Sequence, residues 1–171
     1  MQFAKDSFSV ALRERLAGLN PLRTVVVSGA QRPAVVVLEN ELPSSGAQLS
    51  ECFYLKWGPA QPLAKTQAEA PIYQMECTIS YFTEGTVQSG VDRGRVLGEL
   101  DRELLMICQP PSTGKRDFSQ SPSADLGTGV SWTLPSMADP KIAPDSPASG
   151  TERMTRIAKI TVFFFPEVGA L

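Results

Sequence analysis

The side chains that could carry out chemistry are few, and their spacing does not favour catalysis. The sequence contains no histidine, which excludes Ser-His-Asp and Cys-His centres, histidine metal ligands and histidine proton shuttles. The three cysteines, Cys52, Cys77 and Cys108, form no CxxC pair. Neither a thiolate zinc site nor a disulfide framework is therefore expected. We interpret the cysteines as buried apolar residues of a cytosolic protein.

The acidic and glycine-containing segments also lack a catalytic pattern. Glu99, Asp101 and Glu103 occur two residues apart on a predicted helix, so neighbouring carboxylates point to different sides and form no paired site. We expect surface ion pairs of small value instead, Glu99 with Arg95 or Arg102 and Asp101 with Arg102. No segment matches GxGxxG or GxxxxGKS/T, so no phosphate-binding loop is predicted. The sequence predicts no catalytic residue, metal ligand or cofactor, and an enzyme is the least favoured class.

Residues suited to a binding surface occur in two places. Gly114–Asp117 is the one compact basic cluster of a proline-rich region. It is either a loop tip that contacts a partner or a nucleic-acid backbone, or a solvated turn. The run 163–165, all phenylalanine, and Trp57 either form an exposed patch or pack in the core, and one face of a strand cannot bury all three phenylalanines. The candidate interaction residues are Lys115, Arg116, Asp117, Phe118, Trp57 and Trp132.

Length, charge and hydropathy limit the number of domains and the kinds of partner that are expected. The 171 residues fit a single domain, residues 1–171. A formal charge of -2 argues against non-specific nucleic-acid binding as the main task. No apolar run reaches about 18 residues, so no transmembrane helix is expected. The N-terminal segment lacks the apolar stretch and cleavage site of a signal peptide.

Hydrophobic periodicity predicts the elements that would position these residues. Two amphipathic helices are expected, the first starting with a cap at Asp6 or Ser7 and ending at Gly18, the second over residues 91–108. Strands are expected at 23–27, 33–39, 52–57, 73–81 and 156–165. The first two strands form a hairpin in this prediction, and the apolar run of 33–39 favours a central position in the sheet. The alternation over 73–81 predicts one face on the core and one in water or against a partner.

Residues 109–153 are rich in proline, serine and glycine. This composition predicts an extended loop or arm within the single domain, with a short edge strand at 130–134. Taken together, the elements predict an α+β fold. Its sheet would be mostly antiparallel, with four to six strands packed by two helices and one long proline-rich loop.

The order of these elements resembles the tail terminator proteins of tailed bacteriophages, a family of tail-completion and minor tail proteins. The matching stretches are LRERLAGL, RPAVVVLENE, IYQMECTISYFTEGT, RGRVLGELDRELLMI and RIAKITVFFF, and they leave out 109–153. The resemblance implies a structural virion protein without catalytic residues. It would form a homo-oligomeric, hexameric ring that caps the tail tube and joins it to the head connector.

Under this hypothesis the chain is located in the virion tail and is assembled in the host cytoplasm. Its partners would be copies of itself, the tail tube protein and the head-tail connector protein, with no specific nucleic-acid binding and no membrane. The working surfaces would be 109–153 and the loop 58–71. The alternative hypothesis is a small-ligand or peptide-binding module of bacterial origin, lined by Trp57, Tyr73 and Tyr81.

Overall fold

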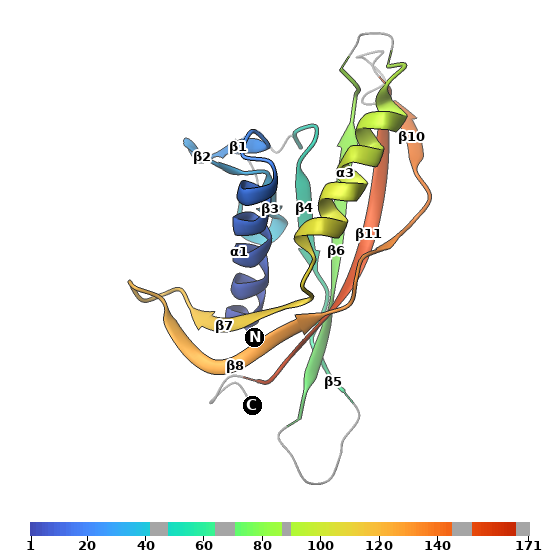
Figure 1. Cartoon of the computed structure of the whole chain (residues 1–171). Helices are drawn as coiled ribbons and strands as arrows, with labels where there is room; N and C mark the ends of the chain where they lie inside the picture. The colour runs from blue at the N-terminus through green and yellow to red at the C-terminus, as the bar shows by residue number, and fades with distance from the viewer. Residues whose placement is uncertain (42–47, 64–70, 87–89, 145–151, 167–171) are drawn as a thin grey trace.

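A curled mixed sheet wraps around a long N-terminal helix (Figure 1). The computed structural model describes residues 1–41, 48–63, 71–86, 90–144 and 152–166. The helices are α1 (Gln2–Leu19), α2 (Leu38–Glu41) and α3 (Arg93–Ile107). The strands are β1 (Thr24–Val27), β2 (Ala30–Pro33), β3 (Val35–Val37), β4 (Phe53–Trp57), β5 (Gln61–Pro62), β6 (Tyr73–Thr83), β7 (Ser112–Asp117), β8 (Ala124–Trp132), β9 (Ser136–Met137), β10 (Lys141–Pro144) and β11 (Glu152–Phe164).

The strands form one large sheet and one separate hairpin. The large sheet has nine strands in the described part, with the main order β3-β4-β6-β11-β8-β7, and β1 pairs only with β2. The β3–β4 pair is parallel, and the pairs along the rest of the main path are antiparallel. The predicted α+β class is confirmed. The sheet is larger than the predicted four to six strands, and α2 adds a third, single-turn helix.

Both long helices pack on the concave face of the sheet. One face of each long helix is buried, with Phe8, Leu12 and Leu16 in α1 and Leu97, Leu100, Leu104 and Ile107 in α3. Alternate residues of β6 and β11 are buried as well, and together they form one hydrophobic core. α1 begins at Gln2 rather than at the predicted caps Asp6 and Ser7, because Ala4 is fully buried and packing extends the helix toward the N-terminus. Gly18 lies within α1, which ends at Leu19. No helix among the described residues is long and apolar enough to cross a membrane.

The N-terminal hairpin differs from the prediction. β1 pairs with β2, not with the valine run that follows. Ser28 and Gly29 have φ values of 52° and 81°, and two successive positive φ values make the tight turn that suits a two-residue hairpin loop. β3 leaves the hairpin and joins the large sheet at the end of its main path, so the predicted central position is wrong. Its valines are buried nevertheless, since α1 and α2 pack against it.

The proline-rich region is also different from the prediction. Residues 109–144 contain the four strands β7–β10 instead of an extended loop, and 145–151 lie outside the described residues. Backbone pairing explains this, because a polar strand needs only hydrogen-bonding neighbours and one buried face. Val130 and Trp132 supply that buried face in β8, which lies between β11 and β7 and is therefore no edge strand. In the predicted loop 58–71, β5 pairs with β6, and 64–70 are outside the described residues.

Two carboxylates of α3 make polar contacts within the fold and are not on the surface as predicted: Glu103 is buried and Asp101 is half-buried. Glu103 accepts hydrogen bonds from Arg23 Nε at 2.8 Å and Asn20 Nδ2 at 2.7 Å, and its side chain is only 6% exposed. Arg23 also pairs with Glu51. Asp101 accepts hydrogen bonds from Tyr81 OH at 2.6 Å and from the Arg156 guanidinium at 2.9 Å. Asp101 therefore pairs with Arg156, which is distant in sequence, and not with Arg102 as predicted.

Replacing Glu103 with alanine removes one partner of this buried ion pair. We expect the free energy of unfolding to fall by about 3 kcal/mol, because the Arg23 guanidinium then stays buried without its main counter-charge. Urea unfolding followed by circular dichroism measures the change. The matched control is Glu99→Ala, at an exposed position of the same helix, which should cost less than about 0.5 kcal/mol. A similar small loss in both variants would contradict a structural role for the Glu103–Arg23 pair.

Candidate functional site

The six candidate interaction residues come together around the first half of α1. The fully buried ring of Phe8 meets Trp57 of β4 edge-on at 5.4 Å and Trp132 of β8 edge-on at 5.0 Å. Trp57 and Trp132 are 7% and 4% exposed. Both tryptophans are therefore core residues, and only one edge of Trp57 borders a surface groove.

The basic cluster lies in a strand, so both predictions for it, a loop tip and a solvated turn, are wrong. β7 packs against α1, and the Arg116 backbone N–H donates to Ser7 Oγ at 2.9 Å. Lys115 is 2% exposed and donates from Nζ to the Phe165 carbonyl at 2.8 Å. Burial lowers the pKa of Lys115. This lysine ties β7 to the end of β11 and presents no charge to solvent.

The end of β7 places Phe118 at the surface. The Asp117 carboxylate accepts hydrogen bonds from the backbone N–H and hydroxyl of Ser119, at 2.9 Å and 2.6 Å, and from Gln120 Nε2 at 2.9 Å. Hydrogen bonds from Ser119, then Gln120, lower the pKa of Asp117. A turn closed in this way by an aspartate fixes the following residues. Phe118 is consequently held 37% exposed beside α1.

Phe118 and Trp57 share one groove, which we call the α1 groove. It has a volume of about 220 Å³ and lies between α1, α2 and the end of β7. Its lining includes Lys5, Ser9, Arg13, Glu41, Trp57 and Phe118. Trp57 and Phe118 belong to segments that are far apart in the sequence, and the fold brings them together in this groove.

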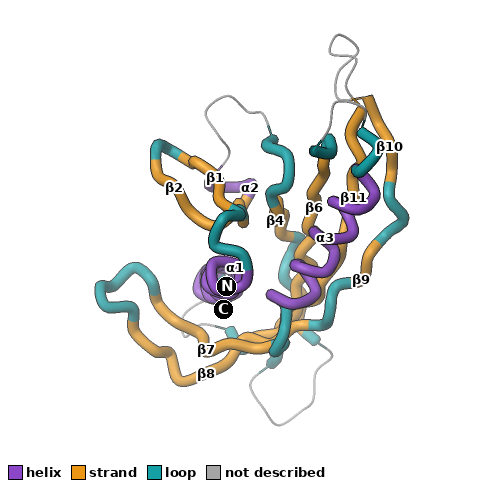
Figure 2. The backbone as a smooth tube through the Cα atoms, turned by 45° about the horizontal axis from the view of Figure 1, so that its top comes forward, coloured by secondary structure: helices purple, strands orange, loops and turns teal. Residues whose placement is uncertain are grey.

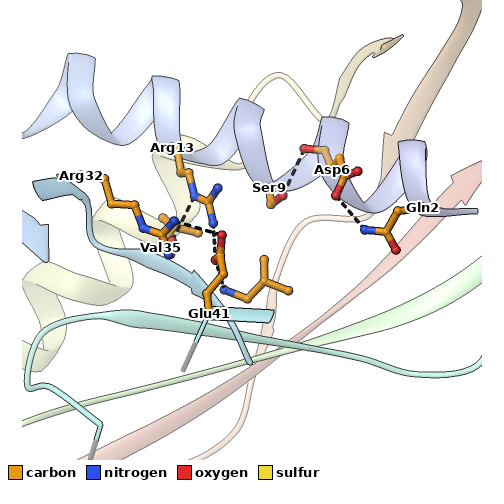
Figure 3. Close-up of polar contacts among 8 residues, drawn as sticks. Gln2, Asp6, Ser9, Arg13, Arg32, Val35 and Glu41 are labelled. Carbon is orange, nitrogen blue, oxygen red and sulfur yellow. Dashed lines mark hydrogen bonds and ion pairs between the residues drawn. The ribbon is translucent and has the colours of Figure 1, made fainter. Parts of the chain in front are cut away.

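One wall of the α1 groove is an ion pair that covers the edge of the sheet (Figure 3). Arg13 donates from Nε to the Val35 carbonyl at 3.1 Å and from Nη2 to Glu41 at 2.5 Å. Glu41 accepts from the Val37 backbone N–H at 2.7 Å and from Arg32 at 3.0 Å. Burial, more than any neighbouring charge, lowers the pKa of Arg13. The outward backbone groups of Val35 and Val37 are thus satisfied by side chains, which protects this edge from pairing with another strand.

The other wall combines a cation with an aromatic ring. Lys5 Nζ lies 5.8 Å from the centroid of the Trp57 ring, within reach of a cation–π attraction. The Trp57 Nε1–H is buried and has no hydrogen-bond partner among the described residues. Asp6 is engaged by Gln2 at 2.8 Å (Figure 3). The buried N–H is not presented to solvent, so what this wall offers a partner is the Lys5 ammonium beside the edge of an aromatic ring.

Sequence reasoning missed Lys5, Arg13 and Glu41. Lys5, Ser9 and Arg13 are spaced four residues apart, and this polar stripe on an otherwise buried helix was the available signal. Glu41 gave no local signal, because its partners are contributed by α1 and β3.

Trp57, Tyr73 and Tyr81 do not line a common pocket, so the ligand site predicted from them is wrong. Tyr81 is fully buried, with its ring edge-on to Phe53 at 5.2 Å. Tyr73 instead packs near Phe164, with 6.1 Å between ring centroids. Burial in the hydrophobic core explains why Tyr81 is unavailable to a ligand.

The cysteines are buried and unpaired, as predicted. Burial raises the pKa of Cys52 and of Cys108 to about 12, and it raises the pKa of Cys77 well above its ordinary value. The thiols are therefore protonated at neutral pH. The residues that the structure describes contain no group of three or more metal-ligating side chains placed to hold an ion.

No protein-family model matches this sequence, and no curated protein matches it. The geometry is therefore the basis for an argument about function. It shows charged and thiol side chains engaged in packing and hydrogen bonding, together with a groove and exposed apolar residues suited to contacts.

The raised thiol pKa values predict both low reactivity and alkaline sensitivity. In the native protein none of the three thiols should react with Ellman's reagent at mildly alkaline pH, whereas all three should react after unfolding in urea. An unfolded thiol titrates near pH ~8.5. The contribution of the buried, protonated thiols to the free energy of unfolding should therefore be fully present below that pH. It should be lost as the pH rises toward about 12, because the thiols of the unfolded state release their protons at a lower pH than those of the folded state. Native-state labelling faster than global unfolding would contradict the burial.

Proposed function

We propose that this chain is a structural subunit of a bacteriophage tail, similar to the tail terminators. It would assemble into a closed, hexameric ring that sits on the last layer of the tail tube and binds the head connector. Its location would be the virion tail, after assembly in the host cytoplasm. It would work through contacts with copies of itself, the tube protein and the connector protein, without a cofactor.

The observation that carries the proposal is the placement of exposed apolar side chains on separate faces. Val26 on the β1–β2 hairpin is 59% exposed, and Phe165 after β11 is 41% exposed. Between them lies a well-filled core, so these residues are not needed for folding of the chain. Exposed apolar groups that gather at distinct places mark protein contact surfaces. Different patches on one subunit favour head-to-tail contacts, which close into rings when the rotation permits.

The arrangement of the elements supports the same proposal. The described chain has a helix, a hairpin, β4, β6, α3 and the long strand β11 in the order on which the resemblance rests, with β3, α2, β5 and β7–β10 as further elements between them. The β7–β8 ribbon extends the sheet past α1 (Figure 1) and widens the surface available to neighbours. A formal charge of -2 would let DNA pass through a ring without binding to it.

The proposal predicts a ring. Light scattering on the purified chain, over a concentration series reaching the millimolar range, should show a discrete homo-oligomer. Negative-stain images of the same sample should show annular particles with a central opening, and added tail tubes should carry the protein at one end only. A chain that stays monomeric and leaves tube ends bare would overturn the proposal.

A second candidate function is peptide binding in the α1 groove. It is favoured by the Lys5 ammonium over the Trp57 ring and by the exposed Phe118, which line the same groove. An extended peptide with carboxylate and apolar side chains would match this combination. The groove is open, and its volume of about 220 Å³ is below the roughly 300 Å³ at which small-ligand sites begin, so it suits a side chain of a peptide better than a whole small ligand.

Peptide binding is tested by thermal shift with short acidic peptides that contain leucine or phenylalanine. We expect saturable stabilisation of the native chain, because a ligand that binds only the folded state raises its stability by mass action. Phe118→Ser should abolish the shift, whereas Val91→Ser, at another exposed apolar position, should not. Absence of a shift in the native chain, or an equal shift in both variants, would count against this function.

A further inference from the structure

One face of the large sheet is not covered by either of the long helices. α1 and α3 both pack inside the curl of the sheet (Figure 2), where Tyr81 and Arg156 point toward Asp101 of α3. Side chains alternate along a strand, so the residues next to these point to the opposite side. We call that side of β4, β6, β9, β10 and β11 the outer face. Its exposed residues include Lys56, Glu76, Lys141, Ile157 and Lys159.

Positive charges outnumber negative charges on the outer face. Lys56 of β4 and Lys159 of β11 flank the same position of β6, so their backbones are about 10 Å apart. Lys141 and Arg153 lie farther along, on β10 and β11. Among the described strand residues of this face, Glu76 is the one carboxylate, and it pairs with Lys159 at 3.1 Å. The outer face is therefore cationic in a chain whose formal charge is -2.

The cations surround an exposed apolar residue. Ile157 is 38% exposed, with Ser80 as its register partner and with Thr155 and Lys159 two residues away on the same side of β11. Lys141 is the partner of Thr155 across β10. An apolar centre within a polar and charged rim is typical of protein contact surfaces. The outer face therefore offers a partner both an apolar contact and positive charges.

Two of the lysines lack a counter-charge. Lys56 and Lys141 form no ion pair within the described ranges of the chain. The partly buried guanidinium groups of Arg13, Arg23 and Arg156 are, in contrast, each paired with a carboxylate. A partner that brings carboxylates to the outer face would supply the missing counter-charges. Complementarity of this kind determines which partner is chosen and how fast it associates.

The same composition disfavours other occupants. A second copy docked through its own outer face would bring like charges together, which costs free energy. Single-stranded nucleic acid binds by stacking its bases on aromatic rings. Tyr54 and Phe82, beside Ser80 on this face, are only 1% and 3% exposed, and the Arg153 guanidinium lies over the Phe82 ring at 4.7 Å. A DNA duplex is held through many phosphate contacts, more than these cations provide.

We propose that the outer face docks an acidic surface of another protein, on which carboxylates surround an apolar side chain. The carboxylates lie opposite Lys56, Lys141 and Lys159, and the apolar side chain packs on Ile157. This contact goes beyond the ring proposed above, because it concerns a partner other than copies of this chain. It does not require the chain to form a ring.

The contact is tested with a short peptide that carries glutamates on both sides of a single leucine. The peptide is added to the isotopically labelled chain while amide NMR signals are recorded. We expect saturable shifts at Thr78, Ser80 and Ile157 that weaken as salt is added, because salt screens contacts between surface charges. A peptide with lysine in place of each glutamate should leave these signals unchanged.

Two charge reversals separate a specific contact from general attraction. Lys56→Glu alters the outer face, whereas Arg95→Glu makes the same change in net charge on α3, where the Arg95 side chain is 73% exposed. We expect Lys56→Glu to raise the dissociation constant of the peptide about tenfold, since it opposes like charges. Arg95→Glu should change it less than about twofold. Ile157→Thr should weaken binding and leave its salt dependence unchanged. Circular dichroism verifies that all variants are folded.

Several results would overturn the contact. These are the absence of shifts, shifts confined to Lys5 and Arg13 of the α1 groove, and equal weakening by Lys56→Glu and Arg95→Glu. Tighter binding of a short DNA duplex than of the peptide at the same residues would identify nucleic acid as the partner and overturn the proposal. A chain that forms no ring but shows the expected shifts would overturn the proposed function and leave this contact standing.

Discussion

The fold depends on the position of Phe8 inside the curl of the sheet. Trp57 and Trp132 belong to β4 and β8, which are separated in the sheet by β6 and β11, yet both touch the same phenylalanine ring. This is geometrically feasible only because the sheet curls around α1. Edge-to-face aromatic pairs contribute about 0.5–1.5 kcal/mol each beyond the burial of area. Arg15 reinforces the curl, because it donates to the carbonyls of Ile107, Pro110 and Ser112 and lies 5.2 Å from the Trp132 ring.

Local periodicity was sufficient for the elements that carry their own signal. α1, α3, β6 and β11 were predicted because one face of each is apolar at the proper spacing. β4 was predicted as a strand although its pattern is less clean, and apart from Lys56 it is buried on both faces. Of the strands in the proline-rich region, only the end of β8 was predicted, as a short strand at 130–134. β7, β9, β10 and the rest of β8 were missed, since most of their residues are polar and show no apolar alternation. For the same reason Asp101 and Glu103 were assigned to the surface. Their partners, Arg156 and Arg23, come from elements that no local pattern connects to α3.

In the candidate site, too, the residue types could be predicted from the sequence, whereas their contacts depend on segments that are distant in sequence. Trp57 and Phe118 could be selected as aromatic residues suited to contacts, but their convergence depends on how β7 lies against α1. Lys115 was selected for its charge, and the alternation of β7 directs that charge inward to the Phe165 carbonyl. When a segment with the composition of a loop forms a strand, every second side chain points into the core, although all of them were expected to be exposed. Composition alone therefore identified suitable residue types, but of the six candidates only Arg116 and Phe118 are exposed.

The polar side chains of α1 also restrict how the molecule can associate. At one end of the main sheet, Arg13 binds the Val35 carbonyl of β3, and at the other end Ser7 Oγ accepts the Arg116 N–H of β7. One helix thus covers backbone groups on both terminal strands, which are the groups that an added strand would use. Association by strand addition at β3 or β7 would have to displace these bonds. Association through side chains on a sheet face requires no such exchange, so the covered edges favour contacts between side chains over strand addition.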